Sequence, residues 1–306
     1  MKITPLHYDR VITGAVCAGV LLLMASSAFA QNLFVSAGLG GSTITQITPG
    51  GTESTFASGL SDPRGLAFNS AGNLFVSDGS GNIYQYTPGG ARSTFALGSV
   101  SLDDLAFNSA GDLFGTGTGN GDIYEFTPGG TQSVFVSGLS MPWALAFNNA
   151  GVLFVSDNAS GNIYEYTPGG VQSTFASGLA NPAGLAFNSA GVLFEADFNS
   201  GNIYEYTPGG VQSTFASGLY APAGLAFNNA GNLYVTAFNA PLVGGYGYGS
   251  IYEFTPGGAQ STFASGLSYP WGMAFQPAPE PSTLGLMAVG SIAFLVRRRK
   301  LRYLAS

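Results

Sequence analysis

Short apolar runs alternate with turn-forming residues along most of the chain, and the stretch 182–219 shows the pattern clearly. Gly-Leu-Ala-Phe and Leu-Phe-Glu-Ala are separated by Asn-Ser-Ala-Gly, in which Asn and Gly tolerate the positive φ of a tight turn. Asn-Ile-Tyr-Glu-Tyr-Thr favours a strand, and Pro-Gly-Gly then turns the chain before Gln-Ser-Thr-Phe-Ala. The pattern predicts four short strands at 184–187, 193–196, 202–207 and 212–216.

The turn Thr-Pro-Gly-Gly recurs at a nearly constant interval. Its threonines follow one another in steps of 39, 40, 40, 40 and 48 residues, at Thr48, Thr87, Thr127, Thr167, Thr207 and Thr255. A period near forty residues is typical of repeat architectures. Four antiparallel strands in each repeat form one blade of a propeller.

The count of strand motifs predicts how the ring closes. Leu-Ala-Phe or Met-Ala-Phe marks six first strands, and Leu-Phe or Leu-Tyr marks six second strands. The series begins on a second strand at Leu33 and ends on a first strand at Met273, so the last blade combines 272–275 with 33–57. The sequence therefore predicts an all-β fold, a six-bladed β-propeller of four-stranded antiparallel blades, over residues 31–276.

These repeats resemble those of NHL-type six-bladed propellers. The resemblance rests on Pro-x-Gly-Leu-Ala-Phe-Asn-x-Ala-Gly-x-Leu-Phe-Val-x-Asp followed by Gly-Asn-Ile-Tyr-Glu-Tyr, and it covers nearly all of residues 33–276. Similar propellers include gluconolactonase-like lactonases and virginiamycin B lyase. The resemblance implies a central metal held by acidic and amide side chains in the first group, and a dependence on histidine in the second. Because propellers host many unrelated activities, it implies the fold and not a function.

The first thirty residues have the three parts of a secretory signal peptide, 1–30. Lys2 and Arg10 make the start positive, residues 11–24 are mostly apolar, and Ala28-Phe29-Ala30 is an A-x-A cleavage site. We expect a signal helix that signal peptidase cuts after Ala30, and export from the cell. The alternative is a retained membrane anchor, although the apolar run is shorter than the ~20 residues that a span needs.

The C-terminal residues 277–306 have the features of a second targeting signal. The motif Pro279-Glu280-Pro281 opens the segment 279–283, an apolar run follows at 284–296, and a basic end follows at 297–302. Basic residues beside an apolar helix stay on the cytoplasmic side, because moving charges through lipid is costly. The three parts resemble the bacterial PEP-CTERM sorting signal. The resemblance implies a transmembrane helix that anchors the protein until an exosortase removes the tail, and release to the cell surface or an exopolysaccharide matrix. The alternative is a plain membrane tail.

Between the two signals the chain is acidic. Residues 31–278 hold two Arg, no Lys and fourteen Asp or Glu, which gives a formal charge of −12. Nucleic acid is therefore excluded as a partner, because phosphate binding needs a basic surface. The same residues contain no His and no Cys, which removes the commonest general base and every cysteine nucleophile.

The repeats differ most in the loop before the first strand and the loop after the second strand. Antiparallel pairing places these two loops on the same face of the ring. Charged or aromatic residues occupy the loop before the first strand in four repeats, at Arg64, Asp103 with Asp104, Trp143 and Trp271. Trp can stack on a flat ligand such as a sugar ring, and Arg can pair with an anion. We expect a binding face for a glycan or a surface protein. The alternative is sequence drift in exposed loops, with each Trp partly buried against a neighbouring blade.

Acidic residues also follow the second strand in three repeats, at Asp78, Asp157 and Asp197. Asp after a strand often caps its own turn. Carboxylates are also suitable Ca²⁺ ligands, although the sequence contains no dense calcium loop. We therefore expect the protein to bind no cofactor. The alternative is that these three aspartates bind Ca²⁺ or another divalent ion.

Two classes of function are compatible with these features. The sequence favours noncatalytic binding of a ligand at the cell surface or in the extracellular matrix. The alternative is a metal-dependent hydrolase or lyase of the lactonase-like type, for which Asp103 and Asp104 are the best carboxylates. Glu195 replaces an apolar residue inside a strand, and we expect its carboxylate to be solvated or to accept a hydrogen bond from the backbone.

Overall fold

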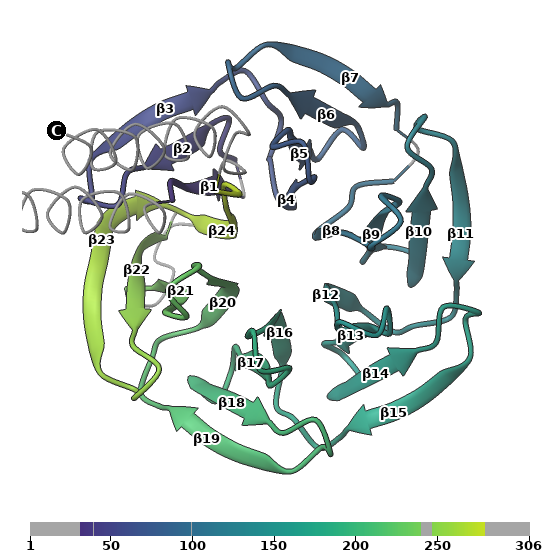
Figure 1. The fold of residues 1–306 in the computed structure, drawn as a ribbon, viewed down its shortest axis with the longest axis vertical. Coiled ribbons are helices and arrows are strands. Elements are labelled where there is room, and N and C mark those ends of the chain that lie inside the picture. The colour runs from purple at the N-terminus through teal and green to yellow at the C-terminus, as the bar shows by residue number, and fades with distance from the viewer. Residues whose placement is uncertain (1–30, 39, 99, 240–246, 279–306) are drawn as a thin grey trace, which may run out of the picture. The chain divides into compact units, whose positions relative to one another are not determined.

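Six four-stranded antiparallel sheets surround a central axis in the computed structural model, which describes residues 31–38, 40–98, 100–239 and 247–278 (Figure 1). The first strand of each sheet lies next to the axis and the last lies at the rim (Figure 1). This is the six-bladed propeller that the repeat predicts. It lies in a unit that ends at Gln276, and the second unit is Pro277–Ser306.

The helices expected at the two ends of the chain fall at 1–30 and 279–306, outside the described residues. Within the described ranges, no helix has the length and apolar character needed to cross a membrane.

We number the blades along the sequence, with blade 1 closing the ring. Blade 1 contains β24 (Pro270–Phe275), β1 (Leu33–Ala37), β2 (Ile44–Ile47) and β3 (Glu53–Ala57). Blade 2 contains β4 (Leu66–Phe68), β5 (Leu74–Ser77), β6 (Ile83–Tyr86) and β7 (Arg92–Ala96). Blade 3 contains β8 (Leu105–Phe107), β9 (Leu113–Gly117), β10 (Asp122–Phe126) and β11 (Gln132–Val136).

The other three blades follow the same order from the axis to the rim. Blade 4 contains β12 (Pro142–Phe147), β13 (Leu153–Asp157), β14 (Asn162–Tyr166) and β15 (Gln172–Ala176). Blade 5 contains β16 (Pro182–Phe187), β17 (Leu193–Asp197), β18 (Asn202–Tyr206) and β19 (Gln212–Ala216). Blade 6 contains β20 (Pro222–Phe227), β21 (Leu233–Phe238), β22 (Tyr248–Phe254) and β23 (Gln260–Ser268).

Blade 1 takes its strands from segments that lie far apart in the sequence. β24 pairs antiparallel with β1, and Leu33 lies opposite Phe275. β24 is longer than the expected strand at 272–275, because pairing resumes beyond a bulge where Ala37 lies opposite Pro270. The pairing joins the two ends of the ring.

The Thr-Pro-Gly-Gly turns are held by local hydrogen bonds. In blade 4 the Gly170 N–H donates to the Thr167 carbonyl at 2.8 Å, and the Val171 N–H donates to Thr167 Oγ1 at 3.2 Å. Gly170 has a φ of 80°, a left-handed value that suits glycine. The turn therefore depends on the hydroxyl of its first residue, Thr, and on a last residue without a side chain, Gly.

The hydrophobic core lies between the blades. Phe154 of blade 4 makes T-shaped contacts with Phe175 of its own blade and with Phe187 of blade 5, each with ring centroids 5.0 Å apart. Aromatic pairs in this geometry add to the free energy gained from burial. Each blade thus buries its faces against its neighbours, as repeat architectures require.

A hydroxyl bridge joins neighbouring blades close to the axis. In blade 4, Ser156 Oγ accepts a hydrogen bond from the Ala144 N–H at 3.0 Å and donates to the Ala183 carbonyl of blade 5 at 2.6 Å. In blade 5 the bridging position holds Ala196, which has no hydroxyl. The bridges hold the backbone of the loops that reach the axis. Matching bridges in blades 1, 2, 3 and 6 are made by Ser36, Ser77, Thr116 and Thr236.

Candidate functional site

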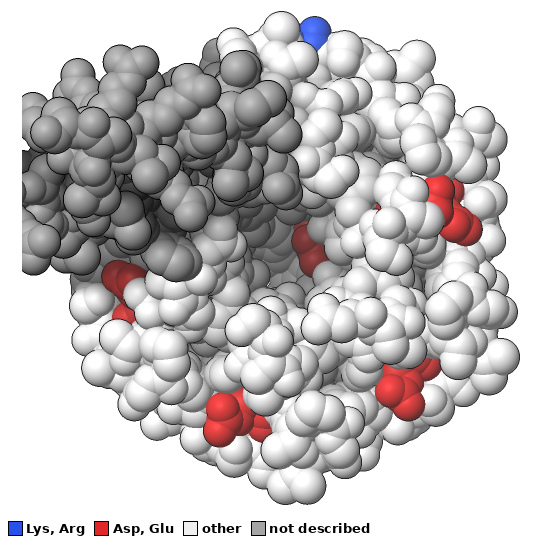
Figure 2. Space-filling view, in the orientation of Figure 1, with Lys and Arg blue, Asp and Glu red and all other residues white. Residues whose placement is uncertain are grey.

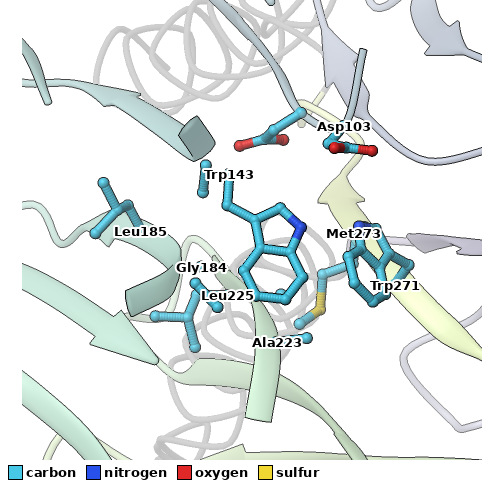
Figure 3. Close-up of a pocket in the computed structure, with 13 residues that line it drawn as sticks. Asp103, Trp143, Gly184, Leu185, Ala223, Leu225, Trp271 and Met273 are labelled. Atoms are coloured by element: carbon cyan, nitrogen blue, oxygen red, sulfur yellow. The ribbon is translucent and has the colours of Figure 1, made fainter. Parts of the chain in front are cut away.

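Two tryptophans from opposite blades meet at the central axis (Figure 3). Trp143 lies in β12 of blade 4 and Trp271 in β24 of blade 1, and their ring centroids are 5.2 Å apart with the planes at 51°. The Trp143 carbonyl accepts a hydrogen bond from Thr116 Oγ1 at 3.0 Å, and the Trp271 carbonyl accepts one from Thr236 Oγ1 at 3.1 Å. The hydroxyl bridges therefore position both indoles. Two cavities share these indoles as walls.

The larger cavity, which we call the mouth, has a volume of about 180 Å³. Its walls come from the loops before the first strand and after the second strand, which are the loops that the sequence singles out. The structure brings four of the five candidate residues together here although they belong to four blades. The lining residues are Gly38, Arg64, Asp103, Thr118, Met141, Trp143 and Trp271.

An aromatic cluster extends from the tryptophan pair over blades 5 and 6. Phe198 lies 5.6 Å from Trp143 and 6.1 Å from Phe238, measured between ring centroids. Tyr269 lies 4.8 Å from Phe238 and stacks on Trp271 at 6.4 Å with the planes at 18°. These five rings form a closed circuit of contacts. The half-buried indoles are therefore supported from behind by other rings.

The wall opposite the tryptophans is ionic. Arg64 of blade 2 donates from Nη1 to Asp103 Oδ1 of blade 3, and from Nη2 to Asp62 Oδ2 at 3.2 Å. Burial lowers the pKa of Arg64, but Asp103 and then Asp62 raise it, and the net direction is upward. The sequence suggests that Arg64 pairs with an anion. In the structure two carboxylates of the chain itself take that place, so the guanidinium is not free.

Asp104 borders the smaller cavity, which has a volume of about 50 Å³. Its Oδ1 accepts a hydrogen bond from the Leu105 N–H at 2.9 Å, and its Oδ2 accepts one from the Leu145 N–H of blade 4 at 3.0 Å. Burial raises the pKa of Asp104 to about 7, although the two backbone donors lower it. Only a few water molecules fit beside it. The equivalent residue in the other blades is small: Gly65, Ala144, Gly184, Gly224 and Gly272.

Four polar side-chain atoms of the mouth make no hydrogen bond to the described part of the chain. They are the Nε1 atoms of Trp143 and Trp271, Nε of Arg64, and Oδ2 of Asp103. In Figure 3 the nitrogen edges of both indoles lie on the side nearer to Asp103. The mouth therefore offers two indole donors, the Arg64 Nε–H and one carboxylate acceptor next to two flat apolar surfaces.

The tail is identified by comparison with protein families. Residues 277–300 match the PEP-CTERM protein-sorting motif. The match includes the Pro-Glu-Pro segment, the apolar run and most of the basic end. The PEP-CTERM motif implies exosortase-dependent export, with anchoring in the membrane by the tail before processing. A search of curated proteins found no match to this chain.

The ring is similar to several solved structures. A chain of a nidogen/laminin complex matches with a TM-score of 0.70 and 19% identity, over 80% of this chain and 98% of that chain. Virginiamycin B lyase from Staphylococcus aureus matches with a TM-score of 0.60 and 15% identity, over 82% and 93% of the two chains. A histidine-to-alanine variant of that lyase is catalytically inactive. A gluconolactonase from Xanthomonas campestris matches with a TM-score of 0.63 and 16% identity, over 79% of this chain and 87% of that chain. At these identities the likeness shows the fold alone.

The expected metal candidates cap loops. Asp157 accepts hydrogen bonds from the N–H groups of Ser140 and Met141 at 3.0 and 2.7 Å. Asp78 accepts backbone N–H bonds within its own turn, and Asp197 accepts them both from its own turn and from the loop before the first strand. The three residues stand in different blades. Among the described residues, no three Asp, Glu, His or Cys side chains are grouped so that they could hold a metal ion.

The channel residues do not fit a divalent ion either. A calcium-binding regucalcin from Agrobacterium tumefaciens has a similar fold, with a TM-score of 0.58 and 17% identity, over 66% of this chain and 77% of that chain. In this chain, however, Asp103 pairs with Arg64, and both carboxylate oxygens of Asp104 accept backbone N–H bonds. No third acidic side chain lines either cavity. We therefore derive no chemical step through a metal.

Glu195 contradicts the sequence prediction that its carboxylate is solvated or hydrogen-bonded. Its side chain is 0% exposed, and neither oxygen has a hydrogen-bond partner among the described residues. Burial raises the pKa of Glu195 well above its usual value, and Asp197 acts in the same direction. The Ala183 N–H lowers the pKa without reaching hydrogen-bond geometry. The prediction is wrong because every residue of β17 is buried.

Sequence reasoning missed several residues of the site, and two further positions of the repeat carry the signal for them. One is the second residue of the loop after the second strand, which differs from blade to blade. Its occupants Gly38 and Thr118 line the mouth, and its occupants Phe198 and Phe238 belong to the aromatic cluster. The position before the loop proline varies as well, and it supplies Asp62, Met141 and Tyr269.

Proposed function

We propose that the exported protein is a noncatalytic binding module whose ligand occupies the mouth. The observation that carries this proposal is the contact between Trp143 and Trp271 over the axis. Their faces supply flat apolar surface, and their free N–H groups stand near the free oxygen of Asp103. Trp combines an apolar body with a polar edge and loses little conformational entropy when it is already held in place. A ligand with a rigid ring and polar substituents fits such a surface.

Catalysis has less support in the mouth. Asp103 is paired with Arg64, and both carboxylate oxygens of Asp104 accept backbone N–H bonds. Histidine is the commonest general base, and the chain's one histidine is His7, which precedes the ring. The inactive variant of the S. aureus lyase has lost a histidine. The residues that remain can hold a ligand more readily than transform one.

The place of action follows from the PEP-CTERM tail. Exosortase-dependent sorting would release the propeller to the cell surface or to an extracellular matrix. In that setting the partner is an exopolysaccharide or a surface protein. The rigid blades hold the variable loops outward, which is a usual arrangement for binding.

The proposal is tested by screening the full-length protein, solubilised in mild detergent, against arrays of glycans and of surface proteins. We expect at least one class to bind, and Trp143→Ala and Trp271→Ala to abolish the signal. Tyr220→Ala is the matched control, because Tyr220 is an exposed aromatic residue that does not line the mouth. Absence of binding to every array member, or binding unaffected by both Trp substitutions, would overturn the proposal.

One observation favours a second candidate, a hydrolase or lyase of the lactonase-like type. The pKa of Asp104 is raised to about 7, which suits a general acid or base at neutral pH. The same protein is assayed on lactones without added metal ions. Turnover that disappears in Asp104→Asn would support this candidate over the binding module.

A further inference from the structure

The mouth is a pit with room for one small ring. Its walls stand on blades 1, 2, 3 and 4, and the tryptophan pair separates it from the smaller cavity on the axis. Its volume of about 180 Å³ is below the roughly 300–1,000 Å³ of typical ligand sites. A longer molecule can therefore place only its end in the mouth, and its remainder must extend into solvent.

The charges around the mouth disfavour an anionic ligand. Within the described residues the basic side chains are Arg64 and Arg92. Arg64 is held by Asp103 and Asp62, and Arg92 lies over the Tyr84 ring of blade 2 at 4.7 Å from its centroid. Residues 31–278 hold fourteen Asp or Glu against these two Arg, and Figure 2 shows acidic atoms on one face of the ring and inside the central opening. A carboxylate or phosphate on the ligand would therefore find no free cation.

The unpaired polar atoms of the mouth match hydroxyl groups. A hydroxyl can accept a hydrogen bond from the Nε1–H of Trp143 or Trp271 and donate one to Asp103 Oδ2. The C–H face of a sugar ring can lie on an indole at the same time. Met141 and Thr118 complete the walls without adding a charge.

We infer that the mouth binds the terminal residue of an uncharged glycan chain and excludes internal residues and acidic sugars. The inference rests on the proposed function, because it specifies the ligand of the same site. The pit is large enough only for the end of a chain. The indoles and Asp103 contact the sugar ring. Uronic acids bind poorly because the mouth has no free cation to pair with their carboxylate.

Chain-end recognition is tested by calorimetric titration of the full-length protein with neutral gluco-, manno- and galacto-oligosaccharides, from the monosaccharide upward. For whichever oligosaccharide series binds, we expect the affinity to stop rising after the disaccharide, because the additional sugar residues lie in solvent. A neutral polysaccharide cut into shorter chains should bind more protein per gram, since each cut creates a chain end. Affinity that keeps rising with length, or capacity per gram that does not change on cutting, would contradict end recognition.

The charge preference is tested with the same oligosaccharides carrying a terminal uronic acid. We expect binding at least about tenfold weaker than that of the neutral chains, a difference of the size that one unfavourable charge contact produces. Asp103→Asn should narrow this gap, because it releases one side of Arg64 for the ligand carboxylate. Equal binding of acidic and neutral ends by the unaltered protein would contradict this part.

The outcomes separate the two proposals. Binding that Trp143→Ala abolishes, but that follows internal residues or acidic sugars, overturns the inference and leaves the proposed function in place. Absence of binding to every glycan and surface protein overturns both. Tyr220→Ala serves as the control in each titration and should bind as the unaltered protein does.

Discussion

The hydroxyl of Ser156 in blade 4 donates a hydrogen bond of 2.6 Å to the carbonyl of Ala183 in blade 5. The same oxygen accepts the N–H of Ala144 from its own blade at 3.0 Å. One buried side chain thus satisfies a donor and an acceptor that belong to different blades. The bridge recurs around the ring, where it also holds the backbone of Arg64, Trp143 and Trp271.

Removing this hydroxyl should weaken the junction between blades 4 and 5. We expect Ser156→Ala to lower the free energy of unfolding by about 1–3 kcal/mol, because it leaves two buried backbone groups without a partner. Denaturant unfolding measures the change. Ser173→Ala is the control, since Ser173 lies on the exposed rim strand β15, and it should change stability by no more than about 0.5 kcal/mol. Equal effects of the two substitutions would refute a role for the bridge.

The junction between blades 5 and 6 lacks a bridging hydroxyl, and adding one should stabilise it. Ala196 is 0% exposed and occupies the bridging position. Ala196→Ser would provide an acceptor for the Gly184 N–H and a donor for the Ala223 carbonyl. We expect the free energy of unfolding to rise by about 1 kcal/mol, the usual net value of a hydrogen bond. A fall in thermal stability would show that the serine is not accommodated there.

The buried carboxyl of Glu195 should make stability depend on pH. Its pKa in the folded protein lies well above its usual value of 4.5, mainly because of burial. The stability that the protonated form provides is therefore fully present below about pH 4.5 and is lost as the pH rises towards the folded pKa. Val stands at this position in blades 1, 2, 4 and 6, as Val35, Val76, Val155 and Val235.

We expect Glu195→Val to raise the free energy of unfolding at neutral pH and to reduce its decline with pH. Unfolding measured at a series of pH values from acid to neutral tests this. Part of the decline should remain, because the pKa of Asp104 is also raised, from 3.8 to about 7. Asp104→Asn should remove that second part. An unchanged profile in Glu195→Val would mean that the carboxyl is not buried as described.

The contact of the two indoles should be visible spectroscopically without any ligand. The chain contains two Trp, and both lie at the axis. Rings 5.2 Å apart are close enough for their electronic transitions to couple. We expect the near-ultraviolet circular dichroism of the unaltered protein to differ from the sum of the Trp143→Phe and Trp271→Phe spectra minus the spectrum of the double variant, which carries the Tyr and Phe background alone. Additive spectra would show that the rings are apart in solution.

Much of the fold could be predicted from the sequence because the information is local. Each Thr-Pro-Gly-Gly turn is held by bonds within five residues, as Thr167, Gly170 and Val171 show. Within a blade, consecutive strands pair with each other, so the alternation of apolar runs and turns is sufficient to define them. The forty-residue period then sets the number of blades.

The arrangement of the candidate site required the tertiary structure. Variation among the repeats singled out Arg64, Asp103, Trp143 and Trp271, and the structure places all four around one cavity. The sequence did not show that Arg64 pairs with Asp103 in the next blade, or that the indoles touch across the ring. These contacts depend on the radius of the ring and on which blades face each other, which no local pattern encodes.

The sequence by itself determined the strands, the turns, the six blades and the sorting tail, since each depends on residues that are near one another along the chain. The tertiary structure decided which polar groups are free. Glu195 was expected to reach water or a backbone donor, yet it is buried without a partner. Whether a side chain meets water, a carboxylate or a ring depends on the neighbouring blade, and that neighbour lies about one whole repeat away in the sequence.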